Sequence, residues 1–139
     1  MILDVIIPNS TTTAIYAMMT ACFLPFVFAI VAKALGGFTP KDNANPRIFL
    51  ANTTGMASRA NAVQVNSFES LPMFLAAVIL AMLFFVPQQV VNNFAWMYVV
   101  IRIAYGMAYV FNLALFRSIL WALSMVCIMM LFYVSMRML

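Results

Sequence analysis

Residues 59–74 read RANAVQVNSFESLPMF and open an apolar segment that continues to residue 86. The stretch places Arg59, Asn66 and Glu69 at successive steps of seven and three residues. On an α-helix those steps keep all three within roughly a quarter-turn of one face. Ionisable groups are costly inside an apolar helix and usually face a bundle interior or a cavity. The stretch therefore predicts a polar stripe on one helix that faces other helices.

The composition of the whole chain predicts a membrane protein. Of its 139 residues, 67% are hydrophobic and 7% are charged, whereas a soluble domain carries about 25% charged residues. This length allows one compact bundle and no second domain. The net charge of +4 comes from seven basic and three acidic residues that are scattered along the chain. Scattered cations indicate an orientation in the bilayer rather than a nucleic-acid partner.

Several kinds of chemistry are disfavoured by the residue types present. The sequence contains no histidine, which removes imidazole bases and most zinc or haem sites, so we expect no metal site. Cys22 and Cys127 both lie in apolar runs, and we expect them to be small buried hydrophobes rather than reactive thiols. The thirteen methionines and thirteen phenylalanines are expected to pack the core and to face lipid.

Four apolar segments, at about 11–36, 56–86, 92–113 and 117–137, are each long enough to cross a bilayer as a helix. Pro25 is expected to kink the first one, and residues 88–93 are expected to form a short uncharged turn. The predicted fold class is an all-α integral membrane protein, with residues 1–139 forming a single up-and-down bundle of four transmembrane helices.

The one long polar connection, residues 38–55, reads FTPKDNANPRIFLANTTG. Its prolines and Asn/Asp turn sites argue against regular structure in its first half. The loop at 36–56 and its borders carry four cations against Asp42 alone: Lys33, Lys41, Arg47 and Arg59. The positive-inside rule then places this loop in the cytoplasm and both termini on the opposite side. Arg137, near the C-terminus, counts mildly against that orientation.

A second polar stripe is predicted on the third apolar segment. Arg102, Tyr105, Tyr109 and Asn112 follow one another at offsets of three, seven and ten residues, which share one helical face. Glu69 and Arg102 would lie about 20 and 16 Å from the inner ends of their helices, at similar depth. Two interpretations remain open at this point. The pair can form a buried ion pair that locks the bundle, or the polar groups can line a hydrated pocket.

These residues resemble the MAPEG family, the membrane-associated proteins in eicosanoid and glutathione metabolism. The resemblance is greatest to small bacterial members, and it rests on four features in order along the chain. They are Asp42-Asn43 with Pro46-Arg47, Gly55 with Arg59-Ala60, Asn66-Ser67-Phe68-Glu69 with Pro72 and Phe74, and Arg102 with Tyr105 and Tyr109. The resemblance implies a homotrimer in a bacterial inner membrane, with glutathione as co-substrate bound between neighbouring protomers at the cytoplasmic end.

The same resemblance implies roles for individual residues. Glutathione would be bound by Arg59, Asn66, Glu69, Arg102 and Tyr105, while Arg117 and Tyr109 would lie nearest its sulfur and act in catalysis. Arginine suits the two carboxylates because its geometry is bidentate, and a cation near the sulfur favours the thiolate. One departure stands out, since members that use glutathione usually have an arginine four residues before the motif asparagine, where this chain has Ala62.

Two functions follow as hypotheses. The first is a membrane-embedded, glutathione-dependent transferase or peroxidase that acts on a lipophilic electrophile, a hydrophobic small molecule from the lipid bilayer. The second is a non-catalytic small subunit or scaffold that associates with other membrane subunits. Ala62 favours the second hypothesis, as does the lack of a nucleophile in either polar stripe.

Overall fold

The computed structural model describes residues 6–139, and within that range every regular element is helical. Four long helices are joined by short connections, except between the first two, where two short helices intervene. In chain order the elements are α2 (Thr11–Gly36), the 3₁₀ helix η1 (Pro40–Ala44), α3 (Pro46–Ala51), α4 (Gly55–Leu83), α5 (Gln88–Val110) and α6 (Ala114–Arg137).

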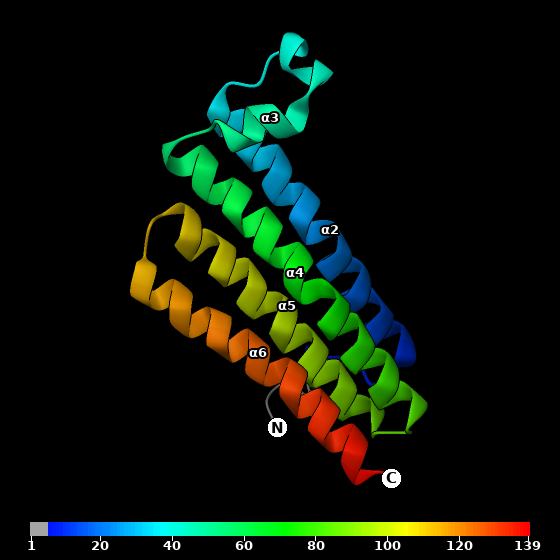
Figure 1. Ribbon diagram of the computed structural model, residues 1–139. Helices are drawn as coiled ribbons and strands as arrows, with labels where there is room; N and C mark the ends of the chain where they lie inside the picture. The colour runs from blue at the N-terminus through cyan, green and yellow to red at the C-terminus, as the bar shows by residue number, and fades with distance from the viewer. Residues whose placement is uncertain (1–5) are drawn as a thin grey trace.

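The four long helices lie side by side, and η1 and α3 project from one end of the group (Figure 1). We call this the loop end; it also carries the turn between α5 and α6. The opposite end, which we call the terminal end, carries the start of α2, the turn between α4 and α5, and the C-terminus. Helices α4 and α5 pack against each other, and each also contacts both α2 and α6. The interface of α4 with α5 is therefore the centre of the fold.

Three of the long helices, α2, α4 and α6, are long and apolar enough to cross a membrane. These three helices and the apolar composition support an integral membrane protein. Helix α5 has 23 residues but does not reach the same apolarity, because its buried face carries polar groups. Those buried polar residues include Asn92, Asn93 and Arg102. Of the four apolar spans expected, three are thus found in the described part of the chain.

The loop between α2 and α4 is more regular than the sequence analysis predicts. Pro40 is the first residue of η1 and Pro46 the first of α3. Proline suits the first position of a helix, because its φ is already helical and its missing N–H would be unpaired there. The Asp42 carboxylate also accepts hydrogen bonds from the backbone N–H and the hydroxyl of Thr39, both at 2.7 Å. The expectation of an irregular first half was therefore wrong.

Helix α5 begins earlier than expected, because residues 88–93 are helical rather than a turn. The turn lies just before them, and Pro87 is the N-cap. The side chains of Gln88 and Gln89 donate to those of Asn92 and Asn93, one helical turn later, at 2.8 and 3.1 Å. These paired amides suit a helix surface, so the polar character of the segment is compatible with a helix.

Small residues let α2 approach its neighbours closely. Its buried face is rich in alanine, and it continues as a helix through the buried Pro25; the kink expected there stays a prediction. The ring of Phe28 packs against Gly106 of α5, where a Cβ atom would lie 2.0 Å from Phe28 Cζ. Glycine at this position therefore sets the contact of α2 with α5. Gly37, with φ of 74°, ends α2 in a left-handed cap.

Candidate functional site

Arg102 is the most deeply buried charged side chain described at the interface of α4 with α5. It is 1% exposed, and its Nη2 donates to the hydroxyl of Ser67 on α4 at 3.1 Å. Its Nε and Nη1 are also buried, and neither has a hydrogen-bond partner among residues 6–139. A buried guanidinium with unused donors is costly. This arrangement suits the binding of an anion or of ordered water.

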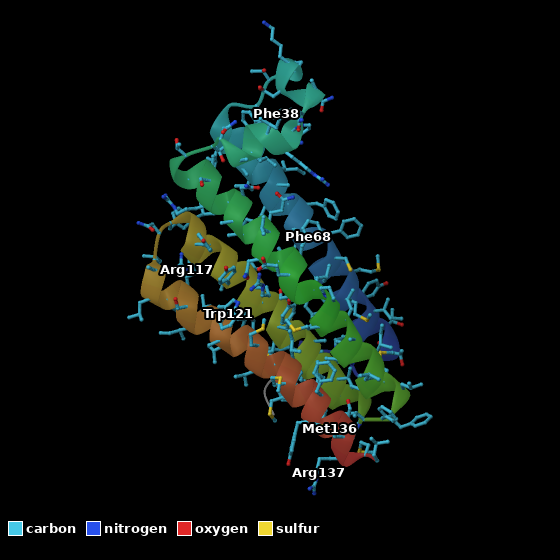
Figure 2. The ribbon with its side chains drawn as sticks, viewed as in Figure 1. Phe38, Phe68, Arg117, Trp121, Met136 and Arg137 are labelled. Atoms are coloured by element: carbon cyan, nitrogen blue, oxygen red, sulfur yellow. The ribbon has the colours of Figure 1, made fainter. Side chains whose placement is uncertain are left out.

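Two tyrosine rings, flanked by two guanidinium groups, connect Arg102 to the loop end. The Arg102 guanidinium lies over the ring of Tyr105, 4.2 Å from its centroid. Tyr105 meets Tyr109 edge to face, with centroids 5.8 Å apart, and the Arg117 guanidinium lies 4.4 Å from the centroid of Tyr109. Figure 2 shows Arg117 on α6, near the end where α5 finishes. The structure thus brings together four of the predicted residues, from α5 and α6.

Asn66 and Glu69 lie together on α4 but do not reach Arg102. The Asn66 side-chain amide donates to Glu69 Oε2 at 3.2 Å, and Glu69 is exposed. Asn66 Oδ1 is buried without a hydrogen-bond partner in the described chain. Within residues 6–139, Arg102 uses Ser67 rather than Glu69 as its partner. The buried ion pair that the sequence left open is therefore not formed.

Arg59 lies at the loop end, where its Nε donates to the backbone carbonyl of Val110 at 2.9 Å. Val110 is the last residue of α5, so the guanidinium satisfies a terminal carbonyl and complements the negative end of the helix dipole. Asn112 departs from the expected stripe, because α5 has already ended. It adopts φ of 61° in the turn to α6 and is exposed.

A hydrogen-bonded group lies beside Arg102 that was not predicted from the sequence. The Tyr98 hydroxyl lies 2.9 Å from Ser70 Oγ, and Ser70 Oγ donates to the Ser67 carbonyl at 3.2 Å. Tyr98 also stacks on Phe74, with ring centroids 4.0 Å apart. The signal was present in the spacing, since Ser67, Ser70 and Phe74 recur at helical intervals on one face. These residues fix the wall against which Arg102 rests.

The charges gathered here favour an anionic ligand. Arg59, Arg102 and Arg117 are three cations near the loop-end half of the α4–α5–α6 group, and Glu69 is the acid on the same part of α4. Ala62 is half-buried and adds no charge. No group of metal-binding side chains is found within residues 6–139. Carboxylates bound by guanidinium groups are thus the chemistry that these residues can support.

Two sizeable cavities lie outside this arrangement. One, of about 630 Å³, is at the loop end between η1, α3 and the start of α4, and Lys41 and Asn52 are among its lining residues. The other, of about 610 Å³, is at the terminal end between residues 6–8, α2 and α5. Neither is lined by the predicted site residues, so the single chain presents Arg102 in a packed interface rather than in an open pocket.

Comparison with protein-family models identifies one family over almost the whole chain. The model described as the MAPEG family matches residues 13–137. Comparisons with curated proteins and with solved structures found no match. The match runs from the start of α2 to the end of α6 and includes the residues around Arg102, Asn66 and Arg117. On this ground the chain, an integral membrane protein with a buried guanidinium at its centre, belongs to the MAPEG family.

Proposed function

We propose that the protein is a membrane-embedded, glutathione-dependent transferase or peroxidase that acts on lipophilic electrophiles. The observation that carries the proposal is Arg102, which is 1% exposed and retains two nitrogen atoms without a hydrogen-bond partner among the described residues. A ligand carboxylate would supply the missing acceptors and the missing negative charge. Family membership supports glutathione as the source of that carboxylate.

Each predicted residue has a role in this proposal. Arg102 and Arg59 bind the carboxylates of glutathione, Glu69 accepts from its ammonium group, and Asn66 and Tyr105 complete the site. Asn66 Oδ1 is buried without a partner in the described chain and can accept one further hydrogen bond. Glu69 is exposed in the single chain, which leaves its carboxylate accessible to a ligand or to a neighbouring protomer. A homotrimer with the ligand between protomers fits this exposure.

Arg117 and Tyr109 activate the sulfur in the proposed reaction. The Arg117 guanidinium lies 4.4 Å from the Tyr109 ring centroid, so a sulfur beside them would meet both a cation and a phenolic O–H. A nearby cation lowers the pKa of a thiol, which is about 8.5 for free cysteine. The thiol proton passes to solvent, the thiolate forms a carbon–sulfur bond, and the bond to the leaving group of the electrophile breaks. Orientation and charge carry this catalysis.

The proposal includes an arrangement in the membrane. All four long helices cross the bilayer as a four-helix bundle, with the loop at 36–56 in the cytoplasm and the terminal end on the other side. Helix α5 can cross because its polar groups are buried, with Arg102 bonded to α4 and Asn92 bonded to the carbonyls of Pro8 and Ser10. The hydrophobic substrate then enters from the bilayer, while glutathione enters from the cytoplasm. A purely structural subunit is less well supported, since it has no need of unused donors on a buried arginine.

Calorimetric titration of glutathione into the detergent-purified protein tests this function. We expect a saturable heat that Arg102→Ala and Glu69→Ala abolish and that the matched variant Arg137→Ala, at an exposed residue, leaves unchanged. Conjugation of a lipophilic electrophile, followed by chromatography, should show the same dependence. An intact oligomer that gives no heat at millimolar glutathione would exclude the proposal and favour the scaffold.

A further inference from the structure

The cavity at the terminal end has a lining that the proposed reaction does not use. It measures about 610 Å³ and lies between a segment that we call the strap, residues 6–10, the first turns of α2 and the middle of α5. Ile6, Ile7 and Pro8 line it from the strap, and Trp96 and Val100 line it from α5. None of its lining residues is acidic or basic. The lining is thus mostly apolar and uncharged, with hydroxyls from Ser10, Thr12, Thr13 and Tyr16.

The strap is held over this cavity by side chains from the start of α5. Asn92 is fully buried, and its amide donates to the carbonyls of Pro8 and Ser10, both at 2.9 Å. Gln89 donates to the carbonyl of Ile7 at 3.1 Å. Because α5 satisfies the strap carbonyls, the apolar side chains of the strap are left to line the cavity. Ligand sites are usually largely pre-formed, and these hydrogen bonds fix the wall of the cavity in that way.

The cavity opens onto an exposed, largely apolar surface of the single chain, which lipid can reach. Ile6, Tyr16 and Val100 line it and are 70%, 58% and 61% exposed. The Trp96 indole N–H is already used, because it donates to the carbonyl of Thr13 at 3.0 Å. The Trp96 ring therefore offers an apolar face, while Thr12 and Tyr16 supply hydroxyls. The start of α2 lies at the terminal end (Figure 1), where a bilayer places its polar head groups.

We propose that this cavity binds a neutral single-chain amphiphile from the bilayer. The hydrocarbon chain lies along Trp96 and Val100, and an uncharged hydroxyl or ester head group bonds to Thr12 and Tyr16. The size is that of a small-ligand site, for which about 300–1,000 Å³ is typical. A charged head group is disfavoured, because no lining side chain carries a compensating charge. The site is at the opposite end from Arg117 and does not depend on glutathione.

The two tryptophans of the chain allow a direct test. Trp96 lines the cavity, whereas Trp121 is a 45% exposed residue of α6 (Figure 2). Trp121→Phe leaves Trp96 as the sole fluorophore, and Trp96→Phe leaves Trp121. Each full-length variant is placed in phosphatidylcholine nanodiscs and titrated with a chain-brominated monoacylglycerol, which quenches tryptophan at short range. We expect quenching of Trp96 to saturate at about tenfold lower mole fraction than quenching of Trp121, a preference of about 1.4 kcal/mol.

Matched substitutions show whether the cavity causes the preference. In the Trp121→Phe background, Val100→Phe fills the cavity and should remove the saturable phase. Met107→Phe, at a residue of the same helix that is 54% exposed and does not line this cavity, should keep it. Equal quenching of Trp96 and Trp121 at every mole fraction would overturn the proposal. Shielding of Trp96 from all probes would also overturn it, because it would mean that a second copy of the chain covers the cavity. Equal saturation by a brominated anionic fatty acid would overturn the preference for a neutral head group.

Discussion

Arg102 of α5 and Ser67 of α4 form a hydrogen bond of 3.1 Å at the most buried part of the interface between their helices. One of the five guanidinium N–H groups thus donates to Ser67, and this bond fixes the direction of the others. The Tyr105 ring limits movement on one side, at 4.2 Å from the guanidinium. Arg102 is therefore oriented by two neutral neighbours, the Ser67 hydroxyl and the Tyr105 ring.

Ser67→Ala should weaken glutathione binding without abolishing it. The loss of one hydrogen bond to a charged group costs about 1.5–3 kcal/mol, so we expect the dissociation constant to rise about tenfold or more. Ser67→Thr keeps a hydroxyl and should recover most of the affinity. Ser118→Ala removes an exposed hydroxyl that donates to the Ala114 carbonyl and should have no effect. Calorimetry measures all three, and equal affinities for Ser67→Ala and the wild type would contradict a positioning role.

Arg117→Ala should lower the rate of conjugation more than it lowers glutathione affinity. Its guanidinium lies over the ring of Tyr109, where a cation stabilises a thiolate. We expect kcat to fall about tenfold or more with a smaller change in KM, and the thiolate absorbance near neutral pH to decrease. Arg117→Lys keeps the charge and should retain part of the rate. A kcat unchanged in Arg117→Ala would show that Arg117 is an interfacial cation only.

The sequence predicted a large part of this arrangement, for identifiable reasons. Helical spacing placed Arg102, Tyr105 and Tyr109 on one face, because periodicity depends only on the helix itself. The same spacing wrongly included Asn112, since no pattern marked the end of α5 at Val110. The approach of Arg117 to Tyr109 depends on how the turn between α5 and α6 folds back. That Arg117 lies close to Tyr109 was inferred from a family resemblance and not from the spacing of the residues.

Other features depend on contacts between residues far apart in the chain. Ser67 belongs to a motif in the sequence, but its role depends on Arg102, which lies opposite it on α5. The contact of Asn92 with the strap joins residues more than eighty positions apart. The prolines at 40 and 46 were interpreted as breakers of regular structure, whereas each is the first residue of a short helix. The local prediction failed because proline both breaks helices in their interior and starts them at the first position.

Gly106→Ala should destabilise the contact of α2 with α5. The added Cβ would lie 2.0 Å from Phe28 Cζ, and Phe28 is itself buried, so its ring must move. Overpacking of this kind costs about 1–3 kcal/mol, which exceeds the gain in helix propensity from alanine, about 1 kcal/mol. Unfolding in mixed micelles measures the loss. Phe28→Leu should restore stability in the Gly106→Ala background, and failure to do so would place the strain elsewhere.

The loop of η1 should respond to acid through Asp42. Hydrogen bonds from the Thr39 side chain and then from its backbone hold the pKa of Asp42 below its ordinary value. Because the pKa is lower in the folded loop, ionised Asp42 stabilises the fold at pH values above the ordinary pKa. This stabilisation is lost as the pH falls through the pKa of the folded state. The amide proton resonance of Thr39, followed by NMR in micelles, should report this titration. Thr39→Val should raise the pKa of Asp42, and an unchanged midpoint would contradict the assignment.

Asn92→Leu should release the strap while leaving the four long helices folded. The substitution removes two hydrogen bonds to the carbonyls of Pro8 and Ser10 and leaves both without these donors. We expect limited proteolysis to cleave within residues 6–10 at least about tenfold faster, in line with a loss of 1.4 kcal/mol or more. Asn52→Leu, at an exposed residue of the loop end, is the control. Equal cleavage of the two variants would show that other contacts hold the strap.

The polar face of α5 has a consequence for how the protein is made. Arginine at the centre of a single inserted helix costs about 2.5–3.5 kcal/mol, and α5 also carries Asn92 and Asn93 on its buried face. In the membrane arrangement proposed above, helix α5 therefore gains little by leaving the translocon alone. Only a three-residue turn, 111–113, separates it from the strongly apolar α6, so the ribosome delivers both almost at once. Biogenesis should then proceed by release of α5 and α6 as one hairpin onto an already integrated α4.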